Sequence, residues 1–134
     1  MRLAVVIAAV IALGTASASA QDLERGEKAF KKCVACHSVG EDAKNKVGPV
    51  LNNVFGRVAG TLADYKYSKA MIEAGEGGLV WTHDVMFEYL HRPNDMVKGT
   101  KMAFAGIKSD EEIEDLLAYL VTFSPDYEPA EGDD

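Results

Sequence analysis

The chain of 134 residues has little cysteine and, after its N-terminal segment, no long hydrophobic run. Two cysteines cannot form a scaffold of several disulfides, and this length has room for one domain. The content of 26% charged and 48% hydrophobic residues is ordinary for a globular protein, which excludes a wholly disordered, collagen-like or coiled-coil chain. The net charge of −7 argues against nucleic acid as a partner.

The long apolar run that does exist stands at the N-terminus. Arg2 precedes the apolar residues 3–13, and small residues follow through Ala20. This order is typical of a secretory signal peptide, so we expect residues 1–20 to be cleaved and the protein to be exported to the periplasm. The alternative is an uncleaved anchor, for which a run of about 20 apolar residues is needed.

Basic residues are missing from the last part of the chain. Residues 110–134 hold ten Asp and Glu and no Lys or Arg, whereas residues 21–109 hold 13 basic and 11 acidic residues. We expect residues 124–134 to form a flexible acidic tail. The positive remainder can dock on an acidic partner despite the overall sign of the charge.

Apolar residues recur at helical spacing in four places, and no strand pattern or internal repeat is present. The patterns predict helices over residues 22–33, 67–74, 83–91 and 110–123. We expect N-caps at Asp22, Thr82 and Ser109, and an end of the second helix at Gly75. Gly26 inside the first helix costs about 1 kcal/mol relative to Ala, which a close helix crossing would explain. About half of the chain is then loop, and such loops need something besides a core to order them.

Both cysteines belong to the motif Cys33-Val34-Ala35-Cys36-His37. This C-x-x-C-H pattern is an attachment signal for haem c. Two thiols at that spacing add to the two vinyl groups of the porphyrin, and the adjacent imidazole then reaches the iron. Attachment turns both thiols into thioethers, so no free thiol remains in an oxidising compartment. A haem attached at this motif would therefore provide the packing surface that orders the long loops.

Other uses of the motif stay open at this point. A redox-active disulfide uses C-x-x-C, normally in a βαβ context that this sequence lacks. A zinc site needs two more ligands, and the available His83 and His91 lie in or beside a helix without a second C-x-x-C. Haem attachment also accounts for the export signal and the thin core, and it is our interpretation.

A six-coordinate iron needs a second ligand on its other face. The candidates are Met71, Met86, Met96, Met102, His83 and His91. Met71 and Met86 fall at apolar helix positions, where the ordinary role is core packing. Met102 is favoured over Met96 because Gly99 and the small residues after Met102 let the backbone approach a planar cofactor closely.

Taken together, the sequence resembles a class I cytochrome c, in particular the bacterial cytochrome c2 group and mitochondrial cytochrome c. The resemblance covers about residues 22–123. The motifs that carry it are Gly26-x-x-x-Phe30, Cys33-Val34-Ala35-Cys36-His37, Val47-Gly48-Pro49-Val50-Leu51, Phe55-Gly56-Arg57 with Gly60, Trp81 with Tyr89, Arg92-Pro93, Gly99-Thr100-Lys101-Met102-Ala103-Phe104 and Leu116-Leu117-Ala118-Tyr119-Leu120. It implies an all-α class I cytochrome c fold over residues 21–123, with four to five short helices and long loops wrapped around one covalently bound haem.

The resemblance also implies roles for single residues. Cys33 and Cys36 would attach the haem c, while His37, bonded to the backbone at Pro49, and Met102 would ligate its iron. A haem propionate would be held by Arg57, Tyr67 and Trp81, and Tyr89 and Thr100 would line the pocket near Met102. These roles suit the chemistry, since a buried propionate needs hydrogen-bond donors.

The function that the resemblance implies is electron transfer, not an enzymatic reaction. A monomeric, soluble periplasmic carrier would take single electrons from a quinol-oxidising cytochrome complex to a terminal oxidase or a photosynthetic reaction centre. The lysines that would ring the haem edge for transient docking are Lys31, Lys32, Lys44, Lys46, Lys98 and Lys101. The alternatives are a peroxidase-like haem enzyme with an open iron, or the haem subunit of a periplasmic dehydrogenase.

The sequence departs from the family pattern in a few places. Lys98 stands where many relatives have Pro, and Met71 stands where many carry Asn. Residues 73–78 form a short insertion relative to the shortest members, and the acidic tail has no counterpart that can be assigned.

Overall fold

The computed structural model describes residues 20–129, in which five helices are joined by long loops. The helices are α1 (Ala20–Phe30), α2 (Lys69–Glu76), α3 (His83–His91), α4 (Pro93–Met96) and α5 (Asp110–Val121). The extended pairing in this range is one isolated antiparallel bridge between Val58 and Val80. The prediction of an all-α fold with four to five short helices is therefore confirmed. The signal-peptide prediction falls almost entirely on residues 1–19, outside the described residues.

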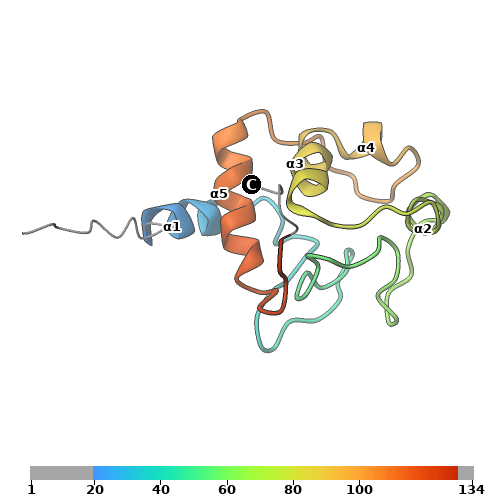
Figure 1. Cartoon of the computed structure of the whole chain (residues 1–134), viewed down its shortest axis with the longest axis horizontal. Helices are drawn as coiled ribbons and strands as arrows, with labels where there is room; N and C mark the ends of the chain where they lie inside the picture. The colour runs from blue at the N-terminus through green and yellow to red at the C-terminus, as the bar shows by residue number, and fades with distance from the viewer. Residues whose placement is uncertain (1–19, 130–134) are drawn as a thin grey trace, which may run out of the picture.

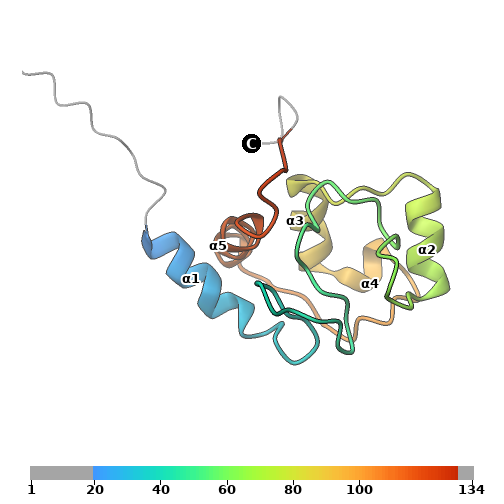
Figure 2. The same cartoon turned by 90° about the horizontal axis from the view of Figure 1, so that it is seen from below.

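Helices from the two ends of the sequence cross closely, α1 lying across α5 (Figures 1 and 2). Gly26 stands at the crossing, where a Cβ atom would lie 2.6 Å from Tyr119 Cβ and would overlap the carbonyl oxygen of Asp115. Arg25 fastens the crossing from its rim, because its Nε donates to Asp115 Oδ2 at 2.8 Å. The close approach that Gly26 predicts is therefore present.

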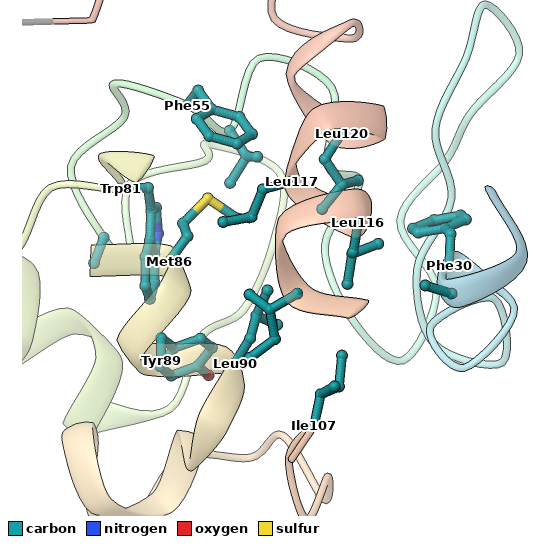
Figure 3. Close-up of a cluster of buried hydrophobic side chains, with 14 of the residues drawn as sticks. Phe30, Phe55, Trp81, Met86, Tyr89, Leu90, Ile107, Leu116, Leu117 and Leu120 are labelled. Carbon is teal, nitrogen blue, oxygen red and sulfur yellow. The ribbon is translucent and has the colours of Figure 1, made fainter. Parts of the chain in front are cut away.

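The core lies on both sides of α5. Figure 3 shows Phe30 of α1 on one side of α5, and Trp81, Met86 and Tyr89 on the other. The fully buried residues of α5 are Ile113, Leu116, Leu117 and Leu120. Their spacing is that of an apolar helix face, and burial of each such side chain contributes roughly 1.5–3 kcal/mol. This helix links the α1 side of the molecule to the loops.

Two of the predicted N-caps are confirmed. Thr82 Oγ1 accepts a hydrogen bond from the backbone N–H of Val85 at 3.3 Å, and Ser109 Oγ accepts from that of Glu112 at 3.2 Å. The prediction for Asp22 is wrong, because α1 begins at Ala20 and Asp22 lies within its first turn.

The prediction that the second helix ends at Gly75 is wrong. This glycine lies inside the helix, which continues to Glu76 and is capped at Gly77. A Cβ atom at Gly75 would overlap the carbonyl group of Ala59, lying 2.8 Å from its carbon. The glycine therefore lets α2 pack against the backbone of a neighbouring loop. Residues 93–108, which lie between two predicted helices, contain the single-turn helix α4.

The segment after α5 folds back onto the body of the molecule. Ser124 is only 4% exposed, and its Oγ accepts a hydrogen bond from the backbone N–H of Phe55 at 3.2 Å. The ring of Tyr127 packs on that of Phe55 with centroids 5.2 Å apart. The folded body thus extends to Tyr127, past the tail boundary that the sequence predicts at residue 124. Residues 130–134 of that tail lie outside the described residues.

Candidate functional site

The Cys-x-x-Cys-His motif forms consecutive turns directly after α1. The N–H of Cys33 donates to the carbonyl of Phe30 at 2.8 Å, and the N–H of His37 donates to that of Cys33 at 2.8 Å. The two thiols are half-buried and are not joined to each other. Burial raises the pKa of Cys33 to about 11, so its sulfur is a neutral thiol at neutral pH. The turns hold both thiols and the imidazole on one short stretch of backbone.

His37 is oriented by the loop at Gly48 and Pro49. Its Nδ1 lies 2.7 Å from the carbonyl oxygen of Pro49. A carbonyl oxygen only accepts, so Nδ1 carries the proton and Nε2 keeps its lone pair for a metal. A Cβ at Gly48 would lie 2.5 Å from His37 Cε1, so the loop approaches the ring too closely for any other residue. Burial lowers the pKa of His37, which favours the neutral imidazole that binds metals.

Met102 is held at a second, separate stretch of loop. Its sulfur accepts a hydrogen bond from the hydroxyl of Tyr89 at 3.3 Å, and its N–H donates to Thr100 Oγ1 at 3.2 Å. Burial raises the pKa of Tyr89, while the Thr100 hydroxyl acts in the opposite direction, so the phenol is a proton donor at neutral pH. Tyr89 and Thr100 therefore each make one hydrogen bond to Met102.

The other candidate ligands are engaged elsewhere. Met71 and Met86 are buried in the core, and Met96 is 36% exposed on the surface. His83 Nε2 lies 2.9 Å from Glu114 Oε2, and His91 Nε2 lies 3.1 Å from Asp110 Oδ1. Met102 is thus the candidate that is half-buried, loop-borne and bonded at its sulfur.

Arg57, Tyr67 and Trp81 are the residues that the resemblance assigns to a haem propionate. The Arg57 guanidinium is half-buried and pairs with no carboxylate within residues 20–129, and burial lowers its pKa. The hydroxyl of Tyr67 accepts a hydrogen bond from the N–H of Leu62 at 3.2 Å, which leaves its own proton to donate. The backbone N–H of Trp81 donates to the backbone carbonyl of Arg57 at 3.0 Å. A half-buried guanidinium that pairs with no carboxylate is suited to bind an anionic group.

These residues fit a covalently held haem. They provide two unjoined thiols, an imidazole with a free Nε2, a thioether and an unpaired guanidinium, which match the vinyl groups, the iron and a propionate. Several half-buried apolar side chains pack against the core while keeping part of their surface uncovered; they include Cys33, Leu51, Tyr67 and Met102. In residues 20–129 no group of three His, Cys, Asp or Glu could hold a metal, so a zinc site finds no support.

The six lysines expected at the haem edge are all exposed, but they are not equivalent. Lys32 forms an ion pair with Glu112, and Lys46 donates to the carbonyl of Val34. Lys101 donates to the carbonyl of Lys66 and lies 5.0 Å from the ring centre of Tyr65. The side chains of the other three lysines, Lys31, Lys44 and Lys98, make no hydrogen bond or ion pair within the described part of the chain.

Two residues near the candidate site were not predicted from the sequence. Tyr65 donates its hydroxyl proton to the carbonyl of Val47 at 2.5 Å and so ties two of the loops together. Tyr127 packs on Phe55 beside the Arg57 segment. An aromatic residue in an otherwise polar, acidic stretch was the available signal for Tyr127.

Comparison with known proteins gives a consistent result. The family model described as Cytochrome c matches residues 23–124. Cytochrome c2 of Afifella marina is 58% identical over 104 residues, which cover 78% of this chain and 84% of that protein. Cytochrome c2 of Agrobacterium tumefaciens is 52% identical over 110 residues, which cover 82% of this chain and 98% of that protein.

The fold has a close match among solved structures as well. The structure of cytochrome c2 from Rhodospirillum centenum superposes with a TM-score of 0.74 at 42% sequence identity. The match covers 78% of this chain and 99% of that one. In the described residues, no helix has the length and apolar character needed to cross a membrane.

Proposed function

Because this chain belongs to the cytochrome c family, whose members carry electrons on a covalently bound haem c and are not enzymes, we propose that it is a soluble periplasmic one-electron carrier. Its iron ligands in this proposal are His37 and Met102. The observation that carries the proposal is the Cys33–His37 turn with His37 Nδ1 bonded to Pro49 O at 2.7 Å. This bond points an unprotonated ring nitrogen away from the loop, as a metal ligand requires.

The bound haem supplies an iron centre that gains and loses one electron, with a potential set by its ligands and surroundings. Cys33 and Cys36 would attach the haem covalently, and His37, oriented by its bond to Pro49, would bind the iron. Tyr89 donates to Met102 Sδ, which restrains the thioether in one orientation. If His37 and Met102 both bind the iron, no ligand position is left for a substrate, so electron transfer is favoured over catalysis at the iron.

The half-buried Arg57 supplies the charge for the anionic edge of the cofactor. Tyr67 and Trp81 add a hydroxyl and an indole N–H that can donate to the same carboxylate. Trp81 also packs on Tyr89, with ring centroids 4.8 Å apart. This contact couples the residues assigned to the propionate to the residues around Met102.

The partners in this proposal are a quinol-oxidising cytochrome complex as donor and a terminal oxidase or a photosynthetic reaction centre as acceptor. Exposed lysines supply the docking charge, and such encounters weaken as ionic strength rises. Lys98 is exposed without a partner in the described residues, whereas Lys32 is already paired with Glu112. Lys98→Gln should therefore slow electron transfer to partner membranes more than Lys32→Gln does.

The rate should be measured at increasing salt for the wild type and both variants. We expect the wild-type rate to fall with salt, and the difference between variants to shrink as screening removes it. A rate that does not change with salt contradicts docking through the lysines.

Production with export and a redox titration test the function itself. We expect a mature N-terminus at Gln21, haem that stays bound on a denaturing gel, and a reversible titration with the slope of about 59 mV per decade of a one-electron couple. Ready binding of carbon monoxide to the reduced protein at neutral pH would instead indicate an open iron and a haem enzyme. Absence of covalent haem would contradict both functions.

A further inference from the structure

The chain after α5 turns back onto residues 53–57 and accepts hydrogen bonds from two of their backbone N–H groups. The N–H of Asn53 donates to the carbonyl of Phe123 at 2.9 Å, and that of Phe55 donates to Ser124 Oγ at 3.2 Å. The N–H of Tyr127 donates to the carbonyl of Ser124 at 3.0 Å, which closes a turn. We call residues 123–127 the C-terminal strap.

Tyr127 completes this contact with its ring. The ring packs on Phe55, and its Cδ2 lies 3.2 Å from the place where a Cβ at Gly56 would stand. Gly56 has a φ of +80°, a conformation that favours glycine for a second reason. The Tyr127 hydroxyl is buried without a hydrogen-bond partner in the described residues. The ring, not the hydroxyl, therefore accounts for the stabilisation that this contact provides.

The segment that the strap holds carries two residues assigned to the cofactor. The N–H of Gly56 donates to the carbonyl of Trp81 at 2.8 Å, and the N–H of Trp81 donates to the carbonyl of Arg57 at 3.0 Å. Arg57 is the residue next to Gly56, so any shift of the strapped segment moves the backbone of both Arg57 and Trp81. These bonds form a continuous connection from the strap to the assigned propionate donors.

We propose that the C-terminal strap is a positioning element of the redox site, which holds Arg57 and Trp81 in place through Phe55 and Gly56. This inference rests on the proposed function, because Arg57 matters as the cation beside the cofactor. A half-buried positive charge disfavours the more positive, oxidised iron. Loosening the strap lets Arg57 move toward water and should therefore lower the midpoint potential.

The test compares Tyr127→Ala with Tyr127→Phe and with Ile113→Val in the full-length, haem-loaded protein. Ile113 is fully buried in α5, away from the strap, so its variant controls for a general loss of stability. Tyr127→Phe keeps the ring and removes a hydroxyl that has no partner, so it should behave as the wild type. Amide hydrogen exchange at Asn53 and Phe55 and the midpoint potential are measured for each.

We expect Tyr127→Ala to speed exchange at both amides by about tenfold or more beyond Ile113→Val, as for a local opening. Its potential should fall, while the potentials of Tyr127→Phe and Ile113→Val should stay at the wild-type value. Unchanged exchange would overturn the strap itself. Faster exchange with an unchanged potential would overturn its role at the redox site.

Failure of the proposed function would look different. In that case the wild type itself would lack covalent haem or a one-electron couple, and the role of the strap toward the cofactor would fall with it. The exchange rates of Asn53 and Phe55 would still decide whether residues 123–127 hold this segment.

Discussion

The helix crossing and the loops around the Cys-x-x-Cys-His motif are stabilised in different ways. The core side chains of α5 are fully covered, since Ile113 and Leu116 are 0% exposed. Around the motif, side chains are half-buried and are held by single hydrogen bonds to loops, as between His37 and Pro49. Cysteine thiols and the Arg57 guanidinium have no partner there within residues 20–129. The helix crossing is stabilised by contacts within the chain, whereas the loops around the motif depend on the haem that the motif attaches.

The largest loss of stability is expected when the covalent attachment of the haem is removed. Cys33→Ser with Cys36→Ser should abolish covalent haem and lower the free energy of unfolding by about 4 kcal/mol or more, as for loss of a ligand present at about 1,000 times its dissociation constant. Haem staining after a denaturing gel and chemical denaturation measure the two effects. Ala35→Ser, which leaves the spacing intact, is the control. A double variant as stable as the control would show that the loops need no bound group.

A second substitution tests the crossing of α1 and α5. Gly26→Ala places a methyl group against the backbone of Asp115, so we expect a loss of stability of about 1–3 kcal/mol. At an exposed helix position the same substitution would be stabilising by up to about 1 kcal/mol. The sign of the change, measured by denaturation beside the exposed control Glu27→Ala, therefore tests the crossing. The optical spectrum of the folded Gly26→Ala protein should stay that of the wild type.

A smaller effect is expected at the start of α5. Ser109→Ala removes the hydroxyl that accepts from the N–H of Glu112 and should cost about 1 kcal/mol of stability. Thermal unfolding measures it, and Ser109→Asp, which restores an acceptor, should recover most of the loss. Equal stability of Ser109→Ala and the wild type would mean that the cap does not contribute. Neither variant should change the site.

The sequence predicts what depends on local chemistry. The caps Thr82 and Ser109 and the crossing at Gly26 follow from hydroxyl groups and from a missing Cβ, and all three are confirmed. The prediction for Gly75 was wrong because a glycine near the end of a helical pattern usually marks the C-terminus of the helix. Its actual role depends on the Ala59 loop, which only tertiary folding brings close. The contact of Tyr127 with its strapped segment has the same origin.

The candidate site shows the same division. The spacing of the motif indicates haem attachment, and the small residues around Met102 favour it as the second ligand. The bond of His37 to Pro49 was implied by the family resemblance. The ion pair of Lys32 with Glu112 joins residues 80 positions apart, so no local pattern could indicate that this lysine differs from Lys98.

We propose that a haem whose iron binds His37 and Met102 completes the packing of the loop region. The most direct test is the optical spectrum of the oxidised protein for the wild type, Met102→Ala and Met96→Ala. We predict a weak far-red band from methionine ligation in the wild type and in Met96→Ala, which is exposed, and its loss in Met102→Ala. A high-spin wild-type spectrum, or a band that survives in Met102→Ala, would contradict ligation of the iron by Met102.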